Sequence, residues 1–140
     1  MTPSAGLWFE PNTGQVKGRT EFIGRTRGAY LYMTVAEVVF VIPSEKMRQV
    51  RMSFVGAAAK PSSRPEQPTG GHSNYFVGKT EKEWFTGIPH HERLRYRDVY
   101  PGIDVVYYGT EGRIEYDFEV KPGADVSKLG IQFSAPVSLA

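Results

Sequence analysis

The sequence predicts an all-β protein, an antiparallel β-sandwich of about seven to ten short strands with one helical turn. The first observation behind this prediction is a series of short segments that alternate apolar with polar residues or consist of β-branched and aromatic residues. The second is the turn-forming residues that separate these segments, since the chain contains 15 glycines and 10 prolines. With 140 residues, of which 40% are hydrophobic, we expect a single domain spanning residues 1–140.

The clearest element is a β-hairpin over residues 103–120. The segment IDVVYY is followed by a four-residue turn, GTEG, and then by the alternating segment RIEYDFEV. A turn of this length pairs Tyr108 with Arg113 and, further back, Asp104 with Asp117. One face of the hairpin is then apolar and belongs to the core, with Ile103, Val105, Tyr107, Ile114, Tyr116 and Phe118.

The other strands are expected on both sides of a low-complexity segment. Before it lie an apolar stub at residues 7–10 and strands at residues 22–25, 29–34, 37–42 and 49–55. After it lie strands at residues 88–97 and 131–134. The segment VVFVI is apolar on both faces, so we expect its strand in the middle of a sheet.

The low-complexity segment itself, residues 56–71, reads GAAAKPSSRPEQPTGG. Its prolines, glycines and small polar residues bury too little surface to offset the entropy lost on ordering, so a mobile loop is predicted. Further on, TEKEWF indicates one helical turn, with Thr80 as N-cap and Glu83 at the capping-box position.

Composition excludes several classes of function. The chain has no cysteine, so it has no disulfides, thiolate zinc sites or cysteine nucleophiles. Its formal net charge is only +2, which argues against a nucleic-acid partner. No segment approaches the roughly 20 apolar residues of a membrane span, and MTPSAGLWFE lacks the features of a signal peptide. The patterned residues begin so close to Met1 that we expect a leader to be missing from the sequence as given.

The polar face of the predicted hairpin is acidic. Two facing carboxylates, Asp104 and Asp117, need a cation, a shared proton or full solvation. The preceding strand supplies Arg95 and Arg97, and a guanidinium matches carboxylates well, so an arginine is the favoured cation.

Two other functions of the acidic face remain open. Asp104, Glu115, Asp117 and Glu119 are candidate calcium ligands because calcium prefers carboxylate oxygens, although no D-x-D-x-D-G loop is present. Asp104, Glu115 and Asp117 are also candidate catalytic acids and bases, as paired carboxylates are in glycosidases. Calcium is therefore the one candidate cofactor of a chain for which we otherwise expect none.

The remaining motifs point away from catalysis. Adjacent residues on a strand point to opposite faces, so His90 and His91 do not naturally bind one metal ion, and His72 lies apart from them. No G-x-S-x-G, G-x-G-x-x-G or P-loop sequence occurs, which argues against a serine hydrolase of that type and against nucleotide binding.

Aromatic residues are the strongest sign of a binding surface. Tyr108 is expected on the polar face of the hairpin, and Trp84 and Tyr100 are further candidates for ligand contact. Exposed tyrosine and tryptophan on a β-sheet suit a sugar or a partner protein. The alternative, in which most of these rings belong to the core, is favoured.

Several motifs carry a resemblance to a known family. They are FEPNTGQ at 9–15, NYFVG at 74–78, W-x-x-G-I-P at 84–89, RYRDVYPGIDVVYYG at 95–109 and GRIEYDFEVKPGAD at 112–125. Together they resemble an uncharacterised domain near the N-terminus of bacterial secreted proteins that carry SBBP-type β-propeller repeats or PKD and other immunoglobulin-like modules. The resemblance implies an all-β domain of extracellular or cell-surface origin and brings no catalytic residues with it. The signal peptide that usually precedes the domain and the repeats that usually follow it are not in this sequence.

These observations favour a non-catalytic extracellular module that contacts a glycan or neighbouring domains. The alternative is a calcium-dependent hydrolase of an ester, lactone or glycoside bond that uses the acidic face. The last strand, at residues 131–134, is expected to leave an unpaired sheet edge, through which a homodimer could form.

Overall fold

The computed structural model describes residues 6–43, 48–58, 62–111 and 113–134. Within these residues it has ten strands, all paired antiparallel, so the predicted all-β class and strand number are confirmed. The strands are β1 (Trp8–Pro11), β2 (Phe22–Arg25), β3 (Tyr30–Met33), β4 (Glu37–Ile42), β5 (Arg48–Phe54), β6 (Ser63–Tyr75), β7 (Phe85–Tyr100), β8 (Ile103–Thr110), β9 (Arg113–Val120) and β10 (Ile131–Ser134). Two short 3₁₀ turns complete the described structure, η1 (Glu81–Glu83) and η2 (Val126–Lys128).

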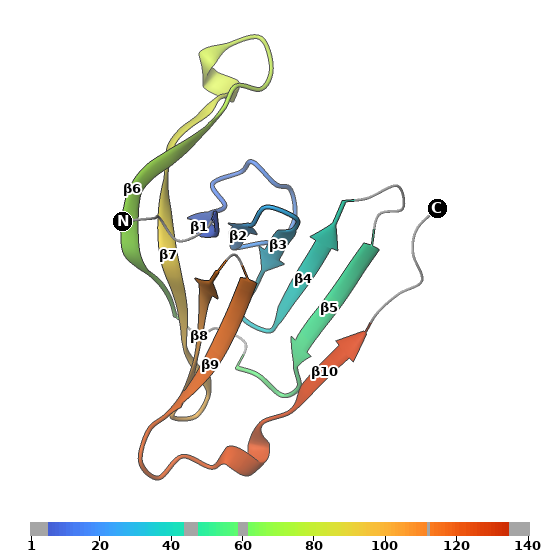
Figure 1. The fold of residues 1–140 in the computed structure, drawn as a ribbon, viewed down its shortest axis with the longest axis vertical. Helices are drawn as coiled ribbons and strands as arrows, with labels where there is room; N and C mark the ends of the chain where they lie inside the picture. Colours follow the sequence, from blue (N-terminus) through green and yellow to red (C-terminus); the bar gives the residue numbers. More distant parts are fainter. Residues whose placement is uncertain (1–5, 44–47, 59–61, 112, 135–140) are drawn as a thin grey trace.

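Hydrogen bonds join all ten strands into one curled sheet (Figure 1). The strand order is β10-β5-β4-β3-β2-β1-β7-β8-β9, with β6 paired to β7 outside this path. The curl brings β9 over β5, where the rings of Phe118 and Phe54 meet edge to face at 5.8 Å. The sheet therefore encloses its core by folding over on itself.

The core lies inside this curl and follows the alternation of the strands. On β3, Leu31 and Met33 are buried while Tyr30 is exposed. Leu94 of β7 and Val105 of β8 meet them in one continuous apolar cluster. Full burial of such a side chain contributes about 1.5–3 kcal/mol, which is what holds the curl closed.

The predicted β8–β9 hairpin forms, but its register differs from the prediction. Thr110 pairs with Arg113, so the turn has two residues and not four, and Glu111 adopts the left-handed φ of 52° that short hairpin turns require. As a result Asp104 pairs with Glu119, and the predicted pairing of Asp104 with Asp117 is wrong. Because the shift is an even number of residues, the core face keeps its predicted members.

The segment predicted as a mobile loop is largely a strand. Residues 63–71 belong to β6, which pairs with β7, and of the predicted loop residues 59–61 lie outside the described residues. Pro65 and Pro68 fit there because β6 pairs with β7 alone among the described strands, and a strand at the edge of a sheet tolerates proline. The register shifts between Pro68 and His72 and again between Ser73 and Tyr75, as expected for such a sequence.

Strands β6 and β7 form a long curved arm that reaches beyond the rest of the sheet (Figure 1). The predicted helical turn is η1, a 3₁₀ turn at the tip of this arm. Thr80 is at its N-cap position but makes no side-chain cap bond, while Glu83 accepts a hydrogen bond from the Lys79 backbone N–H at 3.0 Å. Of the strands at its base, β8 pairs with β7 through residues 93–100, and β1 meets β7 at His91.

Strand β10 ends the sheet order and is bonded to β5 alone among the described strands. Ile131 and Phe133 of this strand are exposed. The position of β10 is the predicted sheet edge, and dimerisation through it stays a prediction. Within the described residues, no helix has the length and apolar character needed to cross a membrane.

Candidate functional site

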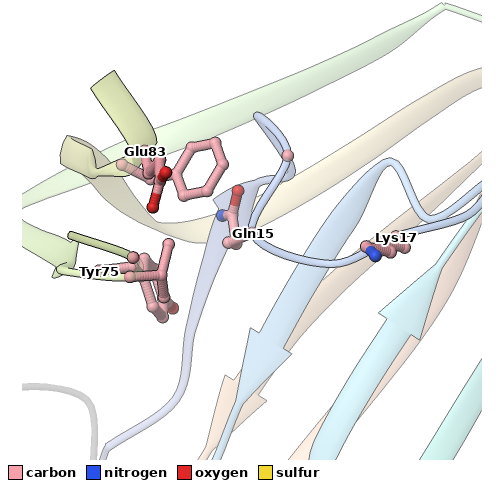
Figure 2. A pocket seen from close by; sticks show the side chains of 8 residues that line it. Gln15, Lys17, Tyr75 and Glu83 are labelled. Atoms are coloured by element: carbon pink, nitrogen blue, oxygen red, sulfur yellow. The ribbon is translucent and has the colours of Figure 1, made fainter. Parts of the chain in front are cut away.

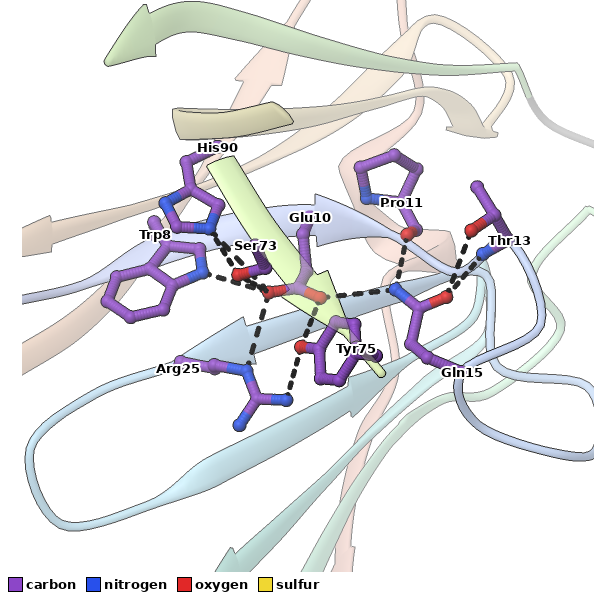
Figure 3. A network of polar contacts seen from close by, with 9 residues as sticks. All are labelled: Trp8, Glu10, Pro11, Thr13, Gln15, Arg25, Ser73, Tyr75 and His90. Atoms are coloured by element: carbon purple, nitrogen blue, oxygen red, sulfur yellow. Dashed lines mark hydrogen bonds and ion pairs between the residues drawn. The ribbon is translucent and has the colours of Figure 1, made fainter. Parts of the chain in front are cut away.

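A buried carboxylate, that of Glu10, lies where the arm crosses strands β1 and β2 (Figure 3). Glu10 is 0% exposed although it belongs to a four-residue strand. A buried carboxylate is costly unless its oxygens are bonded, so its neighbours decide what the site is. We call Glu10 and the side chains around it the Glu10 cluster, which comprises Trp8, Glu10, Gln15, Arg25, Ser73, Tyr75 and His90.

Both oxygens of Glu10 accept several hydrogen bonds. Oε1 accepts from Trp8 Nε1 at 3.0 Å, from Ser73 Oγ at 3.2 Å and from Arg25 Nε at 3.4 Å. Oε2 accepts from Tyr75 hydroxyl at 2.6 Å and from Gln15 Nε2 at 3.1 Å. Every partner is a donor, so the cluster is arranged to hold an ionised carboxylate.

Arg25 supplies the positive charge of the cluster. Its Nη2 donates to the Tyr75 hydroxyl at 2.5 Å, and its guanidinium lies over the rings of Tyr30 and Tyr75 at 5.1 and 5.5 Å. Arg25 on β2 is directly paired with Trp8 on β1, while Tyr75 ends β6. Tyr75 is therefore bonded to both members of the charge pair, which fastens the end of β6 to the body of the sheet.

Ser73 and His90 form a pair that resembles part of a catalytic triad but differs from it in geometry. Ser73 Oγ lies 2.6 Å from His90 Nε2, and the His90 ring stacks on Trp8 at 4.3 Å. Glu10 Oε1 lies 3.9 Å from the same ring nitrogen, whereas the acid of a triad binds the other nitrogen. The Ser73 hydroxyl donates a hydrogen bond to Glu10, so its oxygen is left to accept from His90 Nε2–H. In this arrangement His90 is a donor to Ser73, whereas the histidine of a triad accepts the serine proton.

The cluster shifts the pKa values of its acidic and basic members. Burial alone would raise the pKa of Glu10, but hydrogen bonds from Tyr75, Trp8 and Gln15 and the charge of Arg25 outweigh it and lower the pKa. Burial lowers the pKa of His90. The folded state therefore favours a charged Glu10 and a neutral His90.

These shifts predict a loss of stability in acid that occurs in two steps. A group whose pKa is lower in the folded than in the unfolded state destabilises the fold as the pH falls from the unfolded to the folded value. The free energy of unfolding should begin to fall below pH 6.5, the unfolded value of His90 and of His91, whose pKa is also lowered. It should fall further below pH 4.5, the unfolded value of Glu10. Urea unfolding from pH 8 to pH 3 measures both steps. His90→Gln should reduce the first step, and an unchanged first step in this variant would contradict the assignment.

The cation predicted beside Asp104 is Arg95. Its Nη1 donates to Asp104 Oδ2 at 3.0 Å and to Glu119 Oε1 at 2.6 Å, and its Nε donates to Glu66 Oε2 at 3.0 Å. The other oxygen of Asp104 accepts from the backbone N–H of Asp98, which lies in a bulge of β7 with φ 52°. Asp104 and Arg95 thus hold the bulged end of β7 against the hairpin.

The other predicted acidic residues lie further along the hairpin. Glu115 and Asp117 are exposed, and Asp117 accepts a hydrogen bond from the Tyr108 hydroxyl at 3.1 Å. Asp104 and Glu119 both pair with Arg95, and the charge between these two predicted calcium ligands is therefore a guanidinium. In the part of the chain that the structure describes, no three histidine, aspartate or glutamate side chains are placed to hold a metal ion.

The three aromatic candidates have different positions. Tyr100 is 3% exposed and its hydroxyl donates to the Val55 carbonyl, so its ring belongs to the core, and ligand contact by Tyr100 stays a prediction. Tyr108 is half-buried under the guanidinium of Arg93, at 5.6 Å. Trp84 is exposed at the tip of the arm.

Sequence reasoning missed the Glu10 cluster, which joins Trp8 and Glu10 near the start of the chain to Tyr75 and His90 far along it. The one local signal was the glutamate in the otherwise apolar stub at residues 7–10. The three histidines that the sequence analysis considered as metal ligands lie in different places. His90 belongs to the cluster, His91 pairs with Phe9 on β1, and His72 is exposed.

Comparison with known proteins identifies a family. A family model described as Domain of unknown function (DUF7948) matches residues 9–140. The curated proteins contain no match to the chain, and neither do the solved structures.

Proposed function

The chain belongs to this family of unknown function, and we propose that it is a non-catalytic binding or structural module of a larger extracellular protein, where it contacts a glycan or a neighbouring domain. The proposal extends to the secreted, repeat-containing context that the sequence motifs resemble. No cofactor is required for this role.

The observation that carries the proposal is the apolar tip of the arm. Phe76 is 64% exposed, and its ring meets the ring of Trp84 edge to face at 4.9 Å. Val77 beside them is also exposed. Tryptophan and other aromatic residues that are gathered on a projecting element are typical of the centre of a binding surface.

The polar clusters support a structural role in place of a catalytic one. The Glu10 carboxylate is saturated with donors, and the Ser73 hydroxyl donates one of these hydrogen bonds. Arg95 binds Asp104, one of the three candidate catalytic carboxylates, together with Glu66 and Glu119. These groups fix the arm and the hairpin in place, which is what a module that presents a surface needs.

The proposal predicts that binding depends on the tip. Trp84→Ala and Phe76→Ala should each weaken binding at least about tenfold, because exposed aromatic anchors provide much of the energy of such contacts. The measurement is binding of the labelled chain to an immobilised oligosaccharide panel and to the adjacent domains of the parent protein. Phe133→Ala, an exposed phenylalanine on β10, is the matched control and should bind normally.

Other outcomes of this experiment would revise the proposal. A loss of binding in Phe133→Ala but not in the tip variants would move the surface to the β10 edge. Turnover of chromogenic esters, lactones or glycosides that disappears with a chelator and in Asp117→Asn would replace the binding role with the calcium-dependent hydrolase.

A further inference from the structure

A pocket of about 640 Å³ lies between the tip of the arm and the loop that follows β1. Figure 2 shows Tyr75 and Glu83 of the arm on one side and Gln15 and Lys17 of the loop on the other. Val77 and Phe85 are apolar side chains in its wall. A ligand here would contact two segments that are distant in the sequence.

The loop is held tightly against the arm, so the pocket exists before any ligand arrives. Gly14 packs on the Phe85 ring so closely that a Cβ at this position would come within 2.8 Å of the ring. The Gln15 side chain is held in place because its amide nitrogen donates to the Glu10 carboxylate and to the Pro11 carbonyl. A preformed pocket avoids the entropy cost of ordering loops on binding.

Most of the polar groups that line the pocket are already engaged within the protein. Gln15 Oε1 accepts from the Thr13 backbone N–H at 2.7 Å, which completes the bonds of that amide. The Tyr75 hydroxyl is held by Glu10 and Arg25. One oxygen of Glu83 accepts from the Lys79 backbone N–H. A hydroxyl-rich ligand that entered this pocket would leave many of its own groups without partners, at a cost of about 1–3 kcal/mol each.

An apolar side chain pays no such cost. It would cover Val77, which is 47% exposed, and the ring of Phe85, and each CH₂ group removed from water would contribute about 0.8 kcal/mol. The volume is ample for an aromatic or a branched aliphatic side chain. The chemistry of the wall therefore favours a protein partner over a sugar.

Lys17, at the loop end of the pocket, favours a negative charge on whatever binds there. Its side chain is exposed, and within the described residues it makes no hydrogen bond or ion pair. A carboxylate next to the apolar side chain would complement this ammonium, and a basic residue at the same place would be repelled. The arm end carries the opposite charge, from Glu83, so the orientation of a bound segment is also set.

Resting on the binding role proposed above, we propose that this pocket binds an acidic segment of a protein partner, with a large apolar side chain in the pocket and an aspartate or glutamate against Lys17. Glu83 at the opposite end places the basic or neutral part of the segment towards the tip of the arm. The apolar and the acidic side chain of the segment provide the recognition. The amide of Gln15 takes no part in it, because its hydrogen bonds are already made within the protein.

The test is a selection of random peptides displayed on phage against the whole chain. We expect enriched peptides to share a large apolar residue close to an acidic one. Synthetic copies of the enriched peptides should perturb the NMR signals of Lys17, Val77 and Phe85. Val77→Asp should weaken their binding at least about tenfold, because it places a charge in the apolar wall. Lys17→Glu should change the selected peptides from acidic to basic, while Lys79→Glu, at the tip but outside the pocket, should select the original peptides.

Several results would overturn the inference. They are a selection without enrichment, enriched peptides that bind Val77→Asp normally, and enriched peptides whose charge does not follow that of residue 17. If oligosaccharides shift the signals of the pocket and peptides do not, the partner class is wrong but the binding role stands. If neither binds and a chelator-sensitive hydrolase activity is found, the binding role itself is wrong.

Discussion

Replacing Glu10 with alanine is expected to lower the free energy of unfolding by about 3–5 kcal/mol, as measured by urea unfolding at pH 7. The substitution removes the acceptor of five donors and takes away the carboxylate that balances the Arg25 charge, while Arg25 keeps its hydrogen bond to the Tyr75 hydroxyl. Breaking a buried charge pair from one side costs more than the pair contributes, because the remaining charge keeps its desolvation penalty. This loss is a large part of the total stability of a domain of ordinary size.

Two further variants make the Glu10 prediction testable even if the alanine variant does not fold. Tyr75→Phe removes one donor and keeps the ring, so it should cost about 1–2 kcal/mol. Glu37→Gln, which breaks the exposed pair of Glu37 with Arg51, should cost less than about 1 kcal/mol. If Tyr75→Phe and Glu37→Gln cost the same, the Glu10 cluster is no more than a surface contact.

The β8–β9 hairpin shows how far local sequence determines structure. Alternation placed Val105, Tyr107 and Tyr116 on the core face, and they lie there in the structure or pack against it. Alternation does not define the register, which depends on the length of the turn. The sequence GTEG is compatible with a four-residue turn and with the two-residue turn that forms, and the shorter turn is the one that matches the twist of the strands.

Strand β6 shows why composition failed elsewhere. A segment with prolines and glycines has little intrinsic preference for a strand, and that preference predicted a loop. In the structure β7 provides a partner along the whole of β6, from Ser63 opposite Tyr96 to Tyr75 opposite Phe85. Pairing between segments that are distant in sequence overrides local preference, and no local pattern reports it.

The Glu10 cluster could not be predicted for the same reason. Its members come from β1, the loop that follows it, β2, β6 and β7, and the curl of the sheet and the path of the arm bring them together. The Arg95 site was predictable in part, because a strand with alternating arginines precedes an acidic hairpin. Its third carboxylate, Glu66, comes from the segment that composition assigned to a loop.

The second large effect is expected for Arg95. Arg95→Met keeps the length of the side chain and removes its charge, which leaves the carboxylates of Glu66, Asp104 and Glu119 close together without a cation. Asp104 is only 6% exposed, so its charge is the most costly of the three. We expect a loss of about 3–5 kcal/mol in the free energy of unfolding at pH 7, and adding Asp104→Asn to Arg95→Met should recover part of it.

Arg97→Met is the matched control for this prediction, because Arg97 lies two residues further along β7, is exposed and has no side-chain ion pair within the described residues. It should change stability by less than about 0.5 kcal/mol.

Adding calcium is an independent test, because carboxylates that are already paired with an arginine have no need of a metal ion. Calcium should therefore leave the melting temperature of the wild-type chain unchanged. A rise in that temperature with calcium, abolished by Asp104→Asn, would show that the acidic face binds a metal ion in preference to Arg95. The dependence on Asp104 would identify its carboxylate as a ligand of that ion.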